Sequence, residues 1–327
     1  VQWALYYPPI IDFRLAAYPR MSRLPQIGEA LVAARENDFA GAAAKLDAVP
    51  VTRRGAQYYS LRGALVLSVG AIEDARDDIA RALALDPSNG TAHALQSVIA
   101  VTQNKPDQAL RLARQAVELD PESAVPHVAL SYAYQAMFDI DNARESAKRA
   151  VAMAPNNGLA HARLSELELS RGYLDRARDA AESAAALDPD LGRTQTVLGF
   201  AHLTEINIDQ ALSAFEEAIR LDPAGPLPRL GLGLAKMRQS NLAEGSREIE
   251  IAASLDPNHS VIRSYLGKAY YEQKRTAAAQ TEFAIAKELD PLDPTPWFYD
   301  AILKQTINRP VEALRDIQRA IELNDNR

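Results

Sequence analysis

The stretch of sequence that decides the fold is residues 192–225, GRTQTVLGFAHLTEINIDQALSAFEEAIRLDPAG. Near its end lies the triplet Leu221-Asp222-Pro223, and prolines recur at the same spacing on both sides of it. Seven prolines stand 34 residues apart, namely Pro87, Pro121, Pro155, Pro189, Pro223, Pro257 and Pro291. A fixed period of about 20–50 residues indicates a stack of similar supersecondary units. The chain is therefore predicted to be a repeat array.

Small residues recur at three places in this period. With the proline at position 32 of a 34-residue unit, position 27 is alanine in all eight units and position 20 in seven. Position 8 is always small, as Gly63, Ser97, Ser131, Ser165, Gly199, Gly233, Gly267 and Ala301. Small side chains let two helices approach closely, and proline ends the second helix because it lacks an N–H and disfavours helix before it. Each unit is predicted to be an antiparallel helix pair.

The predicted domain organisation follows from this register. The eight units are 56–89, 90–123, 124–157, 158–191, 192–225, 226–259, 260–293 and 294–327, the last with Asp325 in place of the proline. We expect residues 23–55 to form a ninth, degenerate helix pair, and residues 1–22 to be an aromatic, extended N-terminal segment. Polar residues after the prolines, such as Asn89, are expected to cap the next helix, and we interpret the glycosylation-like motifs at Asn89 and Asn258 as caps.

The pattern over 56–327 resembles the tetratricopeptide repeat family, on the small residue at position 8, the alanines at 20 and 27 and the proline at 32. The resemblance implies an all-α fold, a right-handed superhelical solenoid of antiparallel helix pairs, with the first helices lining its concave side. The chain departs from the family at position 4, where a large aromatic residue is common. That position holds Tyr59, His93, His127, His161, Gln195, Arg229, Arg263 and Trp297.

Composition excludes several classes of function. The net charge is −7 and there is no long run of lysine or arginine, so nucleic-acid binding is not expected. The absence of cysteine excludes disulfides, thiolate nucleophiles and cysteine-ligated metals. No stretch of about 18 apolar residues occurs, so we expect no direct insertion of this segment into a membrane.

No catalytic, cofactor-binding or metal-binding site is predicted. The histidines at position 4 are 34 residues apart, and because stacked helices lie about 8–10 Å apart, His93, His127 and His161 cannot converge on one ion. Gly231-Leu232-Gly233 lacks the third glycine of a dinucleotide loop, and no nucleophile motif is present. The chain is therefore predicted not to be an enzyme.

The family resemblance implies that positions 2, 5, 9, 12 and 13 of each first helix face the concave groove. The residues predicted there to contact a partner are Tyr132, Gln135, Glu166, Phe200, Leu203, Leu234, Met237, Arg238, Lys268, Tyr271 and Phe298. Their apolar and aromatic character favours a protein or peptide segment with apolar anchors. The alternative is that some of these side chains pack between neighbouring first helices. The lysine–asparagine clamp with which some relatives hold a chaperone's C-terminal carboxylate is not present.

The two ends give further expectations. Residues 1–9, VQWALYYPP, resemble the linker that follows FecR-like domains in bacterial envelope proteins, which implies the periplasm; the cytoplasm is the alternative. The N-terminal segment either finishes an upstream β-rich domain or lies on the solenoid, for example inside the groove. Near the other end, four apolar residues of the last helix are expected to be uncovered, so that further helices follow or the chain self-associates. These residues are Leu314, Ile317, Ala320 and Ile321.

The function predicted from the sequence is a non-catalytic scaffold that binds a peptide or protein segment in its concave groove. The alternative is a periplasmic spacer or assembly section within a larger bacterial secretion or outer-membrane protein.

Overall fold

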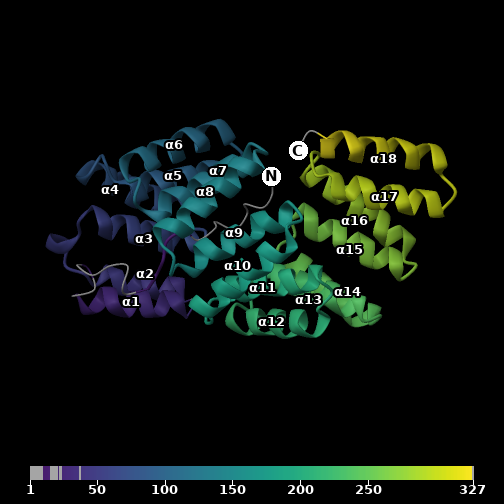
Figure 1. Ribbon diagram of the computed structural model, residues 1–327, viewed down its shortest axis with the longest axis horizontal. Coiled ribbons are helices and arrows are strands. Elements are labelled where there is room, and N and C mark those ends of the chain that lie inside the picture. Colours follow the sequence, from purple (N-terminus) through teal and green to yellow (C-terminus); the bar gives the residue numbers. More distant parts are fainter. Residues whose placement is uncertain (1–9, 15–20, 22–23, 37, 326–327) are drawn as a thin grey trace. The chain divides into compact units, whose positions relative to one another are not determined.

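A computed structural model describes residues 10–14, 21, 24–36 and 38–325 (Figure 1). Residues 1–9, with the stretch that resembles the FecR-associated linker, lie outside the described residues. Over the described residues the chain forms helices and no strand. The helices are α1 (Pro25–Arg35), α2 (Phe39–Asp47), the 3-10 helix η3 (Val51–Arg53), α3 (Ala56–Ser68), α4 (Ile72–Leu85), α5 (Gly90–Thr102), α6 (Pro106–Leu119), α7 (Ala124–Ala136), α8 (Ile140–Met153), α9 (Gly158–Ser170), α10 (Leu174–Leu187), α11 (Gly192–Thr204), α12 (Ile208–Leu221), α13 (Pro226–Arg238), α14 (Leu242–Leu255), α15 (Ser260–Glu272), α16 (Thr276–Leu289), α17 (Pro294–Thr306) and α18 (Pro310–Asp325).

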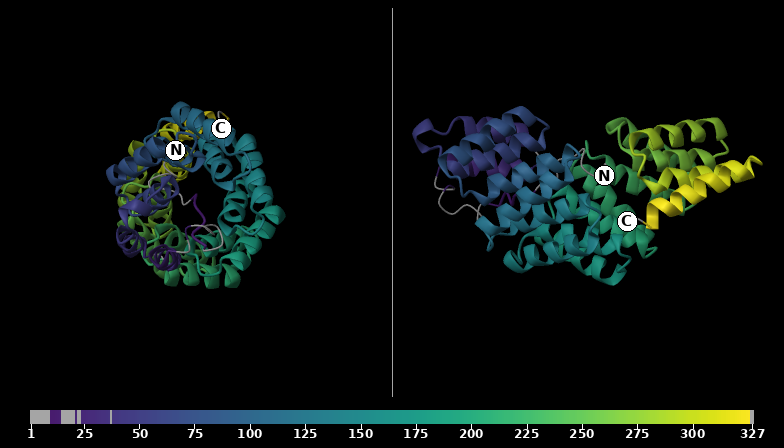
Figure 2. Two further views of the ribbon diagram at one scale, coloured as in Figure 1. Left: turned by 90° about the vertical axis from the view of Figure 1, so that its left-hand side faces the viewer. Right: turned by 90° about the horizontal axis from the view of Figure 1, so that it is seen from above.

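The helices pack as consecutive pairs, for example α3 with α4, α5 with α6 and α13 with α14, and within each compact unit neighbouring pairs are in contact, as α6 with α7 and α14 with α15. Figure 2 shows these pairs from two further sides. The predicted fold class, an all-α stack of antiparallel helix pairs, is confirmed. The chain forms two compact units, and their boundary lies within α11. The described residues of the N-terminal unit run from Ile10 to Val197, and those of the C-terminal unit from Leu198 to Asp325.

The turns between pairs are fixed by short polar contacts. The side chains of Asn89, Asn157 and Asp293 accept hydrogen bonds from the first-turn N–H groups of α5, α9 and α17, as expected for caps. The interpretation of Asn258 as a cap was wrong. The residue that precedes α15 is His259, and the Asn258 N–H donates to Asp256 Oδ1 at 3.2 Å.

In each of the eight 34-residue repeats, the turn inside the helix pair contains one residue in the left-handed backbone region. These residues are Gly70, Asn104, Phe138, Gly172, Ile206, Ser240, Lys274 and Asn308, with φ between 54° and 80°. They lie 34 residues apart, so the turn is part of the repeat. Its sequence signal was missed because only two of the eight are glycines, the residue type that tolerates this conformation without strain.

The core lies between the two helices of each pair. The alanines at positions 20 and 27, from Ala75 to Ala286, have no exposed surface. At position 8 the neighbour differs from repeat to repeat. An added Cβ on Gly199 would lie 2.6 Å from the Phe215 ring, and one on Gly267 would lie 2.5 Å from the Phe283 ring. The glycines therefore make room for large side chains on the second helix.

Candidate functional site

Three predicted groove residues of the N-terminal unit meet in one polar network. Tyr132 lies on α7, and its hydroxyl accepts a hydrogen bond from Arg193 Nη2 at 2.7 Å. The same guanidinium nitrogen donates to Glu166 Oε1 on α9 at 2.6 Å. Arg163, also on α9, donates from Nη2 to Gln135 Oε1 at 2.7 Å and from Nη1 to Glu166 Oε2 at 3.1 Å. Three successive first helices are thereby connected through side chains.

Arg163 is the centre of this network, although it was not among the predicted residues. Its guanidinium lies 3.7 Å from the centroid of the Tyr132 ring, and Nε donates to Ser131 Oγ at 2.8 Å. The side chain is almost fully buried. Its sequence signal is that Arg163 is a charged residue at position 6, where the other seven units carry uncharged residues.

The network holds its charges in fixed positions, and of its charged side chains Arg193 and Glu166 are partly exposed. Burial raises the pKa of the Tyr132 hydroxyl above its ordinary value, and the nearby Arg193 acts in the opposite direction. The Tyr132 hydroxyl therefore stays protonated at neutral pH. Glu166 is shared by the two arginines, so the cluster carries one more positive than negative charge. Such a cluster suits hydrogen-bond acceptors of a partner, such as carboxylates or main-chain carbonyls.

In the C-terminal unit, part of the predicted apolar stripe is covered. Leu203 and Met237 are buried, and Phe200 and Leu234 pack half-buried against a cluster that contains Phe215. Phe200 and Phe215 meet edge to face, with ring centroids 5.0 Å apart. These four groove residues therefore pack between helices, which is the alternative left open by the sequence.

Other predicted residues of this unit are accessible. Phe298 on α17 is 45% exposed, and Ile302, one turn further on, is 37% exposed. The Tyr271 hydroxyl lies 3.0 Å from Thr306 Oγ1, one more turn along α17. Lys268 forms an ion pair with Glu272. We call Lys268, Tyr271, Phe298 and Ile302 the α15–α17 surface; Arg238, on α13, is also exposed.

Five of the eight residues at position 4 contact the turns between repeats. The imidazole Nε2 of His93, His127 and His161 lies 3.2, 3.0 and 2.9 Å from the carbonyl oxygen of the proline six residues earlier. Gln195 and Arg263 donate to the equivalent carbonyl oxygens at 3.1 and 2.9 Å. A side-chain donor thus replaces the family's aromatic residue. The described residues contain no group of three or more His, Asp and Glu placed to hold a metal ion.

None of the helices in the described part of the chain is both long and apolar enough to cross a membrane.

The comparisons with known proteins agree with this architecture. The family model described as "Tetratricopeptide repeat" matches residues 60–124, 128–191 and 230–294, which is more than half of the chain. A search of curated proteins found no match.

Solved structures show the same fold at low sequence identity. The chain superposes on the Cut9–Hcn1 hetero-tetramer of the APC/C with a TM-score of 0.74 at 18% identity, covering 97% of this chain and 63% of that chain. It thus spans under two thirds of that chain. A human IFIT1 dimer with m7Gppp-AAAA gives a TM-score of 0.61 at 17% identity, covering 95% and 84%. A tetratricopeptide repeat protein from Parabacteroides merdae gives 0.54 at 14% identity, covering 72% and 93%.

Proposed function

Because this chain belongs to the tetratricopeptide repeat family, whose fold is generally a scaffold for protein–protein interaction, we propose that it binds a protein segment through its first helices. In this proposal the chain is non-catalytic, and the α15–α17 surface is its main contact in the C-terminal unit. The partly exposed Arg193 and Glu166, held by the buried Arg163, are a second contact in the N-terminal unit.

The observation that carries the proposal is the exposure of Phe298 and Ile302 on a first helix. Both are large apolar side chains, and they follow one another at a spacing of four residues, which places them on one helical face. The Tyr271 hydroxyl is hydrogen-bonded at the end of that row. Apolar side chains left in water beside fixed polar groups are typical of interaction sites.

The chemistry of this surface defines the class of partner. Phe298 and Ile302 offer apolar contact, while Lys268 and Glu272 offer one charge of each sign. An extended or helical segment with two apolar anchors about one helical turn apart, flanked by polar residues, is complementary to it. Truncation of such an anchor typically costs about 2 kcal/mol or more in binding free energy.

The test uses peptides that are selected from a displayed random library for binding to the 327-residue chain. We expect the selected peptides to contain apolar or aromatic anchors and to bind Phe298→Asp at least about tenfold more weakly, which is about 1.4 kcal/mol. Leu255→Asp is the matched control, because Leu255 is a large apolar side chain that is 37% exposed on a second helix, α14, outside both proposed surfaces. Equal weakening by both variants, or by neither, would contradict the proposal. The second result would favour the spacer in a periplasmic assembly instead.

We further propose that α18 supports self-association. Val311, Leu314 and Ile321 are 65%, 57% and 54% exposed, at spacings of three and seven residues that put them on one helical face. The expectation for Ala320 was wrong, since it is buried, and Ile317 is only half-buried rather than uncovered. Sedimentation velocity at increasing concentration should show dimers of the wild-type chain and a monomer for Leu314→Glu. A wild-type chain that stays monomeric at high concentration would contradict this proposal.

A further inference from the structure

A short irregular segment of the N-terminal unit is buried although it belongs to no helix. Ile10, Ile11 and Phe13 are only 3%, 2% and 8% exposed. Between them lies Asp12, whose carboxylate accepts hydrogen bonds from the backbone N–H and from Nε of Arg14, each at 2.9 Å. In Figure 2 this segment, drawn purple, runs inside the curve formed by the helices of its unit.

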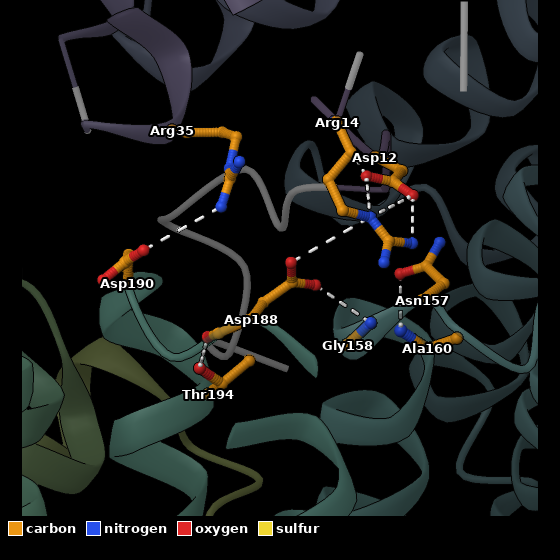
Figure 3. A network of polar contacts seen from close by, with 9 residues as sticks. All are labelled: Asp12, Arg14, Arg35, Asn157, Gly158, Ala160, Asp188, Asp190 and Thr194. Atoms are coloured by element: carbon orange, nitrogen blue, oxygen red, sulfur yellow. Dashed lines mark hydrogen bonds and ion pairs between the residues drawn. The ribbon is translucent and has the colours of Figure 1, made fainter. Parts of the chain in front are cut away.

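The segment joins two parts of the unit that are far apart in sequence. The Phe13 ring lies 5.9 Å from the ring of Phe39 at the start of α2. One residue further on, Arg14 Nε lies 3.9 Å from Asp188 Oδ1, in the turn between α10 and α11 (Figure 3). Beside this pair, Nη2 of Arg35 on α1 lies 3.9 Å from Asp190 Oδ2. Residues 10–14 thus reach from the first helix pair to the last turn of the unit.

Asp188 differs from its counterparts in other repeats. The aspartates at the same position, Asp86, Asp256 and Asp290, each accept a hydrogen bond through Oδ1 from the backbone N–H two residues later. In Asp188 it is Oδ2 that accepts a hydrogen bond, from the N–H of Gly158 at the start of α9, at 3.0 Å. Its Oδ1 is turned toward Arg14 (Figure 3). Asp188 is 8% exposed as a residue, so its carboxylate is held in place and largely shielded from water.

We propose that the inner face of the N-terminal unit is a peptide-binding site occupied by the chain's own residues Ile10–Arg14, and that an external extended peptide of the same chemistry competes for it. The chemistry is two adjacent aliphatic residues, an aromatic residue two positions later, and then an arginine. Apolar contacts hold the first three side chains, and the arginine faces Asp188. This inference is separate from the α15–α17 surface, because every residue that it uses lies in the N-terminal unit.

The contacts of residues 10–14 are of a kind that an external peptide can replace. It makes no helix or strand hydrogen bonds along its length, and its burial is offset by the conformational entropy lost when five residues are ordered. A tethered segment of this kind acts at an effective concentration of about millimolar. The tethered segment therefore prevents binding of peptides with low affinity, whereas peptides with higher affinity displace it.

The experiment uses fluorescence anisotropy to measure how tightly a labelled peptide with the sequence of residues 8–16, PPIIDFRLA, binds to the 327-residue chain. In Ile11→Asp, a charge in the buried seat displaces the tethered segment. We expect the peptide to bind this variant at least about tenfold more tightly than the wild-type chain, because the competitor in the same chain is gone. Equal binding to both chains, or binding to neither, overturns the proposal.

Charge reversal tests whether the arginine of the peptide contacts Asp188. In the Ile11→Asp background, Asp188→Lys should weaken binding of the peptide at least about tenfold. A peptide with glutamate in place of its arginine should bind this double variant again. Asp190→Lys is the matched control, with an expected change below about twofold, since Asp190 is exposed and pairs with Arg35. If Asp188→Lys and Asp190→Lys act alike, the assigned seat is wrong.

A folding control keeps the test decisive. Helical circular dichroism and the urea midpoint are measured for Ile11→Asp, and Arg14→Glu is the milder second variant, since it leaves the apolar residues in place and removes the contacts of Arg14 with Asp12 and Asp188. If both variants unfold the N-terminal unit, the segment is an integral part of the fold, and the proposal fails.

Discussion

The repeats over 90–191 and those over 192–293 place different side chains between their two helices. In the first group position 8 is serine and position 24 alanine, as in Ser97 with Ala113. In the second group position 8 is glycine, and position 24 is Phe215, Ile249 or Phe283. Ser97 Oγ donates to the Ala109 carbonyl oxygen at 2.8 Å, and Ser165 Oγ to Ala177 at 2.7 Å. In the remaining repeat of the first group, Ser131 Oγ donates instead to the Val128 carbonyl oxygen of its own helix. Two of the three repeats in the first group therefore join their helices by a serine hydrogen bond, whereas the repeats of the second group pack a large buried side chain between theirs.

The comparison teaches that one backbone period can be stabilised by different kinds of interaction. A hydrogen bond between helices contributes about 1 kcal/mol net, whereas a fully buried aromatic side chain contributes several times more. The repeats over 192–293, with glycine at position 8, gain more stability from this burial. Their helices are packed so closely that an added side-chain atom at position 8 is not accommodated. Substitutions at the two positions should therefore act very differently in the two groups.

The largest effect is expected for Phe215→Ala. Phe215 is fully buried and contacts the Phe200 ring, so the substitution leaves a cavity and should lower the free energy of unfolding by about 3–5 kcal/mol. Urea unfolding of the 327-residue chain measures the change. Phe298→Ala is the control, because its side chain is 45% exposed, and it should change stability much less. A similar loss for both variants would remove the distinction between buried and surface aromatics.

Gly233→Ala is expected to be the next largest. An added Cβ would lie 2.5 Å from Ile249 Cγ1 and 2.7 Å from the Gly245 carbonyl oxygen, so the helices must separate. We expect a destabilisation of about 1–3 kcal/mol in urea unfolding. Gly63→Ala is the matched control at the same repeat position, where the nearest atoms lie at 3.5 Å. That variant should be neutral or slightly stabilising, since alanine favours helix over glycine; equal losses would contradict the packing argument.

A smaller, pH-dependent effect is expected at His259. Burial lowers the pKa of its imidazole, while Asp256 and Asp293 act in the opposite direction. The unfolded chain therefore takes up a proton more readily, and stability is lost as the pH falls below about 6.5. His259 stands at the position where Asn89 and Asn157 cap their helices, so His259→Asn should supply a cap worth about 1 kcal/mol.

The check is the urea midpoint measured at several pH values for wild type and His259→Asn. The urea midpoint of the wild-type chain should decrease more steeply toward acid pH than that of the variant. Parallel curves would show that another group carries the acid sensitivity.

The smallest effect is expected at the turns inside the pairs. Gly172 in the first group and Ile206 in the second both have positive φ, at 74° and 65°. A β-branched residue is strained there, so Ile206→Gly should raise the free energy of unfolding by about 0.5–1 kcal/mol. Gly172→Ile is the reverse control and should destabilise by at least as much. A thermal shift of the same sign in both variants would contradict the role of backbone strain.

Much of the fold was predictable because its signals are local. The helix pairs follow from a proline and small residues at fixed places, and the contacts that these residues make lie within one repeat. The candidate site was harder to predict. Leu203 and Phe298 share apolar character and a first-helix position, yet one is buried and the other is 45% exposed. That difference depends on which neighbouring helix covers each residue, and the periodicity does not report it.

The repeat period, the all-α class and the family of this protein were thus determined by the amino-acid sequence itself, because each depends on backbone preferences and on side-chain size at fixed spacing. The network around Arg163 and the seat of Ile10–Arg14 were decided only by tertiary structure. In the first, Tyr132 meets Arg193; in the second, Arg14 meets Asp188. Contacts between residues so distant along the chain form only once the helix pairs have stacked, and no local pattern specifies them.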